Sequence, residues 1–295
     1  MSQRCNICPR LCNVDRNKST GFCRAKNNAV ISKVMLHHFE EPPISGTKGS
    51  GAIFFASCTL KCVYCQNYEI STKCQGKEVD TKTLADLFKQ LEDAGAHNIN
   101  LVTPTHFTQQ IIEALNLYHP RIPIIWNTSG FERPETIQKL KGYVDIFLTD
   151  FKYFSSEISN KYSLAPNYFE TCSKACLEMR KIQPIDIFEN GLMKQGLIIR
   201  HLNLPNQTKD SEKIIDWIND NLGNETYISL MSQYTPMGKA NNYPEINRKI
   251  KPLEYKYLIN KLNSLVFKNV FLQDFSSASK EFTPNFSDNK SEFNY

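Results

Sequence analysis

The chain has 295 residues, 41% of them hydrophobic and 22% charged, which suits one large α/β domain and excludes wholesale disorder. The net charge of +5 comes from intermixed acidic and basic residues, which argues against a nucleic-acid partner. No apolar run approaches the roughly 20 residues that span a bilayer, and the N-terminus has no signal-peptide core. We therefore expect a cytoplasmic protein with no membrane partner.

Three segments differ in composition. Residues 1–45 form a cysteine-rich extension with little periodicity, which ends at a Glu-Glu-Pro-Pro break. Residues 46–275 carry a regular alternation of strand-like and helix-like patterns. Residues 276–295 are rich in Ser, Asn and Lys, and we expect this tail to wrap the surface or fray.

Apolar runs in the central segment predict strands that are buried on both faces, as in parallel sheets. Amphipathic stretches between them predict helices. The predicted strands are residues 51–57, 98–103, 122–127, 143–150, 196–202, 225–233 and 269–275. The predicted helices are residues 81–94, 107–118, 134–141, 168–181, 209–222 and 252–266. This alternation fits right-handed βαβ units, in either a doubly wound sheet or a partial or full (β/α) barrel.

Cysteines are concentrated near the N-terminus: the chain has ten, and most of them precede residue 75. In a reducing compartment such dense cysteines indicate metal or redox chemistry. The alternative, a secreted disulfide scaffold, suits much shorter chains. The cysteines in this part are Cys5, Cys8, Cys12, Cys23, Cys58, Cys62, Cys65 and Cys74.

The connection from residue 58 to residue 80 is unusually long for a βα loop and begins with a C-x3-C-x2-C motif, Cys58, Cys62 and Cys65. Thiolates at this spacing select zinc, copper(I) or an iron–sulfur cluster. Three ligands leave one position open for a substrate or cofactor, whereas a structural site is closed by a fourth. Cys74 is the residue that could close it.

This motif, with Tyr64 before its last cysteine, resembles the cluster motif of the radical S-adenosylmethionine superfamily. Further segments follow one another as in the family related to pyruvate formate-lyase activating enzyme, and the resemblance runs from about Cys5 to Phe286. These segments are the Cys5–Cys23 leader, Cys62–Ser71, Val102–His106, Asp150–Lys152, Arg200–Pro205 and Ser229–Tyr234.

The resemblance implies a partial (β/α)6 TIM-like barrel with the cysteine-rich extension at its N-terminus. It also implies a [4Fe-4S] cluster on Cys58, Cys62 and Cys65, and reductive cleavage of S-adenosylmethionine to a 5′-deoxyadenosyl radical that abstracts a hydrogen atom. A glycyl-radical protein would be the substrate, and flavodoxin or ferredoxin the electron donor. The alternatives are a radical enzyme with another substrate and a zinc-organised binding module in which Cys74 closes the site.

Polar residues at predicted strand ends are candidates for binding S-adenosylmethionine. Thr103 and Thr105 stand where the superfamily usually has a Gly-Gly-Glu-like run, so they would contact the amino group of the cofactor; an ordinary strand end is the alternative. Asp150 and Lys152 are two residues apart in a strand and point the same way. They would face the cofactor, or else form a surface ion pair.

Three more candidates follow from the resemblance and from the chemistry of their side chains. Tyr64 would support the adenine region, and Asn127 with the two residues after it would suit the ribose or cap a loop. Arg200 would pair with the carboxylate of the cofactor through its bidentate fork. The alternative for Arg200 is a core arginine paired with Asp150 or Glu189.

The extension holds four cysteines of its own, Cys5, Cys8, Cys12 and Cys23, in a C-x2-C-x3-C-x10-C pattern. Four thiolates would close a tetrahedral zinc site or hold a second cluster, and packing without metal is the alternative. The remaining cysteines and most histidines are assigned structural or surface positions. These are Cys172 and Cys176 on one helix face, and His37, His38, His97 and His119.

Overall fold

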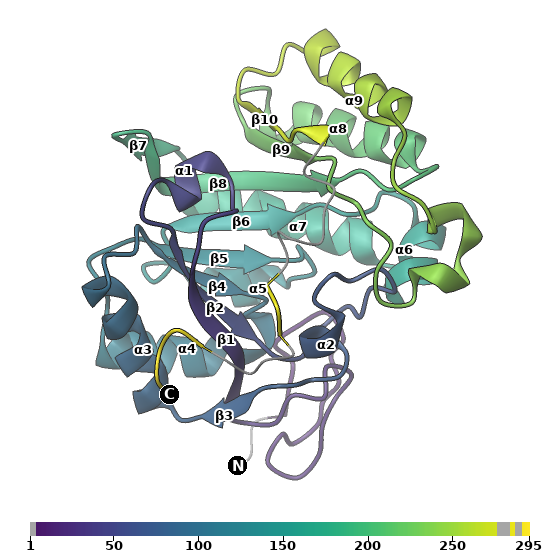
Figure 1. Cartoon of the computed structure of the whole chain (residues 1–295). Coiled ribbons are helices and arrows are strands. Elements are labelled where there is room, and N and C mark those ends of the chain that lie inside the picture. Colours follow the sequence, from purple (N-terminus) through teal and green to yellow (C-terminus); the bar gives the residue numbers. More distant parts are fainter. Residues whose placement is uncertain (1–3, 276–283, 287–290) are drawn as a thin grey trace.

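The computed structural model describes residues 4–275, 284–286 and 291–295 (Figure 1). Its centre is a ten-stranded sheet in the order β10-β9-β8-β6-β5-β4-β2-β1-β3, in which the run from β10 to β2 is parallel. The antiparallel strands are β1, β3 and β7, of which β7 pairs with β8 off the main order. The strands are β1 (Ala29–His37), β2 (Ser50–Phe55), β3 (Lys77–Val79), β4 (Ile99–Val102), β5 (Ile124–Thr128), β6 (Ile146–Asp150), β7 (Ile187–Glu189), β8 (Leu192–Leu202), β9 (Tyr227–Met231) and β10 (Val270–Leu272).

Helices connect the parallel strands, and Figure 1 shows α3 and α4 beside the β2–β4 part of the sheet and α8 and α9 beside β9 and β10. Helix α3 shows why these segments fold as they do: the Asp80 side chain caps its start by accepting from the Thr83 N–H, and one apolar face is buried. The helices are α1 (Pro42–Ser45), α2 (Tyr68–Ser71), α3 (Thr81–Asp93), α4 (Thr108–Leu117), α5 (Pro134–Gln138), α6 (Ser156–Ser163), α7 (Tyr168–Ile182), α8 (Thr208–Leu222) and α9 (Pro252–Ser264). Short 3-10 turns are η1 (Thr105–Phe107), η2 (Ala240–Asn242) and η3 (Pro244–Ile246).

The predicted partial (β/α)6 TIM-like barrel is confirmed. Strands β2, β4, β5, β6, β8 and β9 alternate with helices, and the strand order has two different ends, so the sheet does not close. Each predicted strand and helix has a counterpart in the structure, although α5 ends earlier than expected, at Gln138. The predictions did not include β1, β3 and β7, or the helices α1, α2 and α6.

The sheet begins inside the predicted extension, before the boundary at residue 45. Strand β1 pairs along the length of β2, from Ile31 opposite Phe55 to His37 opposite Ser50. After β1 the chain turns across the barrel interior, where Ile44 of α1 packs into a fully buried cluster. The other buried members of that cluster are Ile125, Ile146, Leu148, Met193 and Ile198. Of the described residues of the extension, those of β1 belong to the sheet, whereas residues 4–28 and 38–45 lie outside it.

The described parts of the predicted tail pack on the sheet. Phe286 is buried against Phe54, with the two rings edge-to-face at 5.4 Å between centroids. The Glu292 N–H donates to the Val34 carbonyl of β1 at 3.1 Å. The rest of the tail lies outside the described residues. Among the residues described, no helix is long and apolar enough to cross a membrane.

Candidate functional site

A cavity of about 200 Å³ lies where the carboxyl ends of the parallel strands meet the loop after β2, the edge at which barrel enzymes build their sites. The residues predicted from the sequence converge here. All of them line the cavity except Thr105: Cys58, Cys62, Tyr64, Cys65, Thr103, Asn127, Asp150, Lys152 and Arg200.

The three loop cysteines each accept a hydrogen bond at sulfur. The Leu60 N–H donates to Cys58 Sγ at 3.4 Å, and the Ser71 hydroxyl donates to Cys65 Sγ at 3.3 Å. Ser163 Oγ, at the end of α6, donates to Cys62 Sγ at 2.9 Å. Hydrogen bonds of this kind favour a sulfur that carries negative charge, as a metal-bound thiolate does.

Two backbone hydrogen bonds fix the centre of the cysteine loop (residues 58–67). The Val63 N–H donates to the Tyr162 carbonyl at 2.9 Å, and the Val63 carbonyl accepts from the Lys239 N–H at 2.6 Å. Gly238 allows this approach: its φ is +58°, and an added Cβ would lie 2.7 Å from the Val63 carbonyl oxygen. The loop is therefore held from α6 on one side and from the segment after β9 on the other.

The donor set fits an iron–sulfur cluster. Three thiols from one short loop face one cavity, and burial raises the pKa of Cys65 to about 12 and that of Cys58 above its ordinary value. A cationic centre is the partner that such buried thiols need in order to ionise. In the described parts of the chain, no three Cys, His, Asp or Glu side chains are already close enough to hold an ion, so ligation would draw the sulfurs together.

Cys74 does not join the other three. Its sulfur contacts the Thr72 carbonyl at 3.6 Å and the Cys23 carbonyl at 4.0 Å. It lines a separate surface groove with residues of β1 and of the C-terminal segment. This placement favours the open, three-cysteine arrangement over the closed zinc site.

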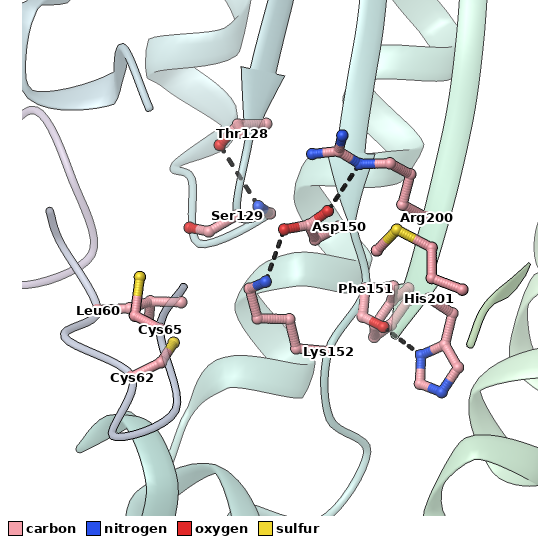
Figure 2. Close-up of polar contacts among 12 residues, drawn as sticks. Leu60, Cys62, Cys65, Thr128, Ser129, Asp150, Phe151, Lys152, Arg200 and His201 are labelled. Atoms are coloured by element: carbon pink, nitrogen blue, oxygen red, sulfur yellow. Dashed lines mark hydrogen bonds and ion pairs between the residues drawn. The ribbon is translucent and has the colours of Figure 1, made fainter. Parts of the chain in front are cut away.

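The Arg200 guanidinium lies at the centre of the polar wall of the cavity (Figure 2). Its Nε donates to Asp150 Oδ1 at 2.9 Å, one terminal nitrogen to Glu40 Oε2 at 3.0 Å, and the other to Asn127 Oδ1 at 2.6 Å. The alternative pairing of Arg200 with Asp150 is thus present, whereas Glu189 contacts Lys194 instead. All three guanidinium nitrogens have protein partners.

Lys152 extends this chain of charges toward the cysteine loop. Its Nζ donates to Asp150 Oδ2 at 2.6 Å, and Figure 2 shows the ammonium between Asp150 and the loop that carries Cys62 and Cys65. Burial raises the pKa of Asp150, but Lys152 and Arg200 outweigh it and hold that pKa below its ordinary value. Burial lowers the pKa of Lys152, and Asp150 reverses this effect and raises it. Both groups are therefore charged at neutral pH.

Two polar residues of the cavity were missed because they come from β1 and the turn after it. Glu40 accepts from Asn100 at 3.0 Å and from Asn127 at 3.2 Å through the oxygen that does not face Arg200. His37, expected on the surface, is buried and lines the cavity, and burial lowers its pKa to about 4. The pairing of β1 with β2, which places both residues here, had no clear periodic signal in the sequence.

Thr105 lies behind the wall rather than in it. Its hydroxyl donates to Glu132 Oε1 at 2.5 Å, and Thr128 and Trp126 donate to the same oxygen at 2.5 and 3.2 Å. The second carboxylate oxygen of Glu132 is buried without a hydrogen-bond partner among the described residues. Burial raises the pKa of Glu132 to about 7, against these hydrogen bonds, which lower it. Glu132 thus ties the ends of β4 and β5 together.

Tyr64 is a buried member of an aromatic group below the cavity. Its hydroxyl lies 2.6 Å from the Tyr153 hydroxyl, and its ring meets those of Tyr153, Tyr162 and Tyr234 edge-to-face. Edge-to-face rings pack rigidly. The aromatic group therefore fixes the part of the loop between Cys62 and Cys65.

The raised pKa of Glu132 predicts a specific pH dependence of stability. Because the folded carboxyl titrates near pH 7 and the unfolded one near 4.5, the folded state binds the proton more tightly between these values. The free energy of unfolding should fall by about 3 kcal/mol as pH rises through this window, relative to Glu132→Gln. Denaturant unfolding at pH 4.5, 6 and 8 measures the difference in free energy of unfolding between the unchanged protein and Glu132→Gln. The titrations of all other groups cancel in this difference. A difference that is the same at each pH would contradict the assignment.

The model of the radical SAM superfamily matches residues 52–218 of the chain. The uncharacterized protein MJ0674 of Methanocaldococcus jannaschii is 34% identical over 258 residues, which cover 84% of this chain and 71% of that protein. The fold is similar to that of Streptococcus suis SuiB, at a TM-score of 0.51 and 12% identity, in crystals with its precursor peptide SuiA and with S-adenosylmethionine. These matches cover 75% of the chain but only 48% and 50% of SuiB, so the chain spans about half the length of SuiB. At 12% identity the likeness shows the fold alone. The chain belongs to the radical SAM superfamily.

Proposed function

We propose that this radical SAM enzyme is a glycyl-radical activating enzyme, of the type that serves pyruvate formate-lyase. The observation that supports its radical chemistry is one cavity, lined both by three cysteines whose sulfurs accept hydrogen bonds and by the charged residues at the strand ends. Cys58, Cys62 and Cys65 would hold a [4Fe-4S] cluster. When bound, the cluster and S-adenosylmethionine supply reductive cleavage of the sulfonium–C5′ bond and a radical that abstracts a hydrogen atom.

The strand ends would bind and orient S-adenosylmethionine. Lys152 has donors beyond the one that contacts Asp150, so its ammonium would receive the carboxylate of the cofactor. Thr103 would face the amino group and Asn127 the ribose. Arg200 would act as a positioning residue, because its nitrogens already hold Asp150 and Asn127 in place.

The apolar side chains of the cavity would exclude water from the reaction. Phe54, Phe55, Val102 and Met231 line the cavity beside the polar strand ends, and all four are buried. A dry cavity limits side reactions of a reactive intermediate.

A peptide segment of the partner would enter beside the chain that follows β9. Gln233, Thr235 and Met237 line the cavity there. SuiB, which has a similar fold, has been crystallised with its precursor peptide bound, so this architecture is compatible with peptide binding. Reduced flavodoxin or ferredoxin would donate the electron.

Single substitution of Cys58, Cys62 or Cys65 by alanine should abolish production of 5′-deoxyadenosine, because two thiolates hold a cluster poorly. Cys74→Ala is the matched control and should retain activity, since its sulfur lies outside the cavity. The assay is anaerobic reconstitution followed by incubation with dithionite and S-adenosylmethionine. Stoichiometric zinc without iron, together with loss of the metal in Cys74→Ala, would support the closed binding module instead.

The glycyl-radical assignment has its own test. The reconstituted enzyme, mixed with a glycyl-radical protein from the same organism, should generate a glycyl doublet in the electron paramagnetic resonance spectrum. Replacing Gln233, Thr235 and Met237 by alanine, while keeping the Gly238–Lys239 contact with the cysteine loop, should remove the doublet and spare 5′-deoxyadenosine formation. Abundant 5′-deoxyadenosine with no doublet on any such protein would point to a radical enzyme with another substrate.

A further inference from the structure

We infer that Cys5, Cys8, Cys12 and Cys23 form a second metal site, with four thiolate ligands, which folds the extension and docks it on the cysteine loop. This site is separate from the cavity described above, and none of its cysteines lines that cavity. It does not depend on the proposed radical chemistry.

The four thiols occupy one neighbourhood. Cys8 and Cys23 are buried at 7% and 8% exposure, and Cys5 and Cys12 are partly buried. Asn13, next to Cys12, donates its N–H to the Cys5 carbonyl, and Phe22, next to Cys23, donates its N–H to Cys12 Sγ. Cys8 begins the turn that leads to Cys12, closed by the Leu11 N–H on the Cys8 carbonyl. Adjoining turns therefore bring the four cysteines together.

The backbone of the extension is shaped around these cysteines without regular structure, since residues 4–28 contain no helix or strand. The Asn13 N–H donates to the Cys5 carbonyl at 2.9 Å, and the Leu11 N–H closes a turn onto the Cys8 carbonyl at 3.1 Å. Leu11, Asn13 and Arg24 have φ of +44°, +54° and +65°. Residues other than glycine adopt this region rarely and at a cost, so another interaction must hold the turns.

Hydrogen bonds to sulfur recur here as they do in the cysteine loop. The Phe22 N–H donates to Cys12 Sγ at 3.3 Å. Gly21 leaves room for the Cys12 sulfur, because an added Cβ would lie 2.7 Å from it. Backbone N–H groups directed at sulfur favour thiolates, the form that ligates a metal.

Arg10 joins the extension to the cysteine loop. Its guanidinium donates to the Thr59 carbonyl at 2.9 Å and the Ser163 carbonyl at 3.2 Å, and it lies 3.8 Å from the centre of the Phe22 ring. Thr59 follows Cys58, and Ser163 is the donor to Cys62. A metal that fixes the turn at residues 8–11 would therefore position Arg10 against both ends of the C-x3-C motif.

Metal ligation explains how so short a segment keeps this shape. A segment with few apolar residues and no helix or strand needs a cross-link, and four cysteines supply a closed tetrahedral coordination. Among the described residues no three such side chains are already close enough to hold an ion, so ligation would draw these sulfurs together. The occupant is a thiophilic centre, either one zinc ion or an iron–sulfur cluster, and metal analysis distinguishes the two.

The test uses a chain in which Cys58, Cys62 and Cys65 are all alanine, so that the loop cannot contribute metal. This variant, purified and then exposed anaerobically to zinc or to iron and sulfide, should retain about one metal centre per chain after desalting. Adding Cys8→Ser and Cys23→Ser should remove the metal, whereas adding Cys74→Ser should not. Zinc alone would identify an ion, and iron with equimolar sulfide a cluster.

A second measurement distinguishes loss of the metal from misfolding of the whole chain. Titration of the triple-alanine chain with a mercurial should release its metal as four thiols react, and release should expose residues 4–28 to limited proteolysis while the barrel stays intact. A folded triple-alanine chain that binds neither zinc nor iron would overturn the inference. Loss of metal on Cys74→Ser would also overturn it, because Cys74 approaches the Cys23 carbonyl and would then be a ligand.

Discussion

The largely buried guanidinium of Arg200, whose side chain is 14% exposed, connects strand ends that are far apart in the chain, and the shape of the cavity depends on it. An ion removed from water is costly unless partners compensate, and here Asp150, Asn127 and Glu40 each accept from a different nitrogen. These acceptors come from β6, β5 and the turn after β1. Lys152 extends the series by binding the other oxygen of Asp150. Two cations thus alternate with two carboxylates, which fixes each polar side chain without leaving a net charge.

The cysteine loop depends on contacts that the charged strand ends do not supply. Ser163 serves two segments at once: its hydroxyl donates to Cys62, while its carbonyl accepts from Arg10 of the extension. Lys239 holds the same loop from the segment after β9. The loop is therefore clamped between the extension, α6 and the carboxyl edge of the sheet. Contacts from three separate parts of the chain thus fix the backbone from which the thiols reach the cavity.

Local patterns predicted the strands and helices of the barrel and the grouping of Cys58, Cys62 and Cys65, because apolar periodicity and motif spacing are properties of neighbouring residues. Local patterns could not predict which side chains from these elements meet in the cavity, because those contacts join residues that are far apart in the sequence. Strand β1 carries buried Lys33 and His37 among its apolar residues, which obscures its pattern. The partners of Glu40, which are Asn100, Asn127 and Arg200, all lie far along the chain from it. Thr105 was expected to contact the cofactor; in the structure it begins η1, two residues after the end of β4, and its hydroxyl donates to Glu132.

The proposed chemistry depends most on the claim that Cys58, Cys62 and Cys65 would hold a cluster and leave one iron for S-adenosylmethionine. The most direct measurement is the electron paramagnetic resonance spectrum of the reduced, reconstituted protein, recorded with and without S-adenosylmethionine. To isolate this centre, the spectrum is compared with that of a chain in which the three loop cysteines are alanine. An open iron predicts that the loop-dependent signal changes when S-adenosylmethionine is added. A loop-dependent signal that stays unchanged at saturating S-adenosylmethionine would contradict the claim.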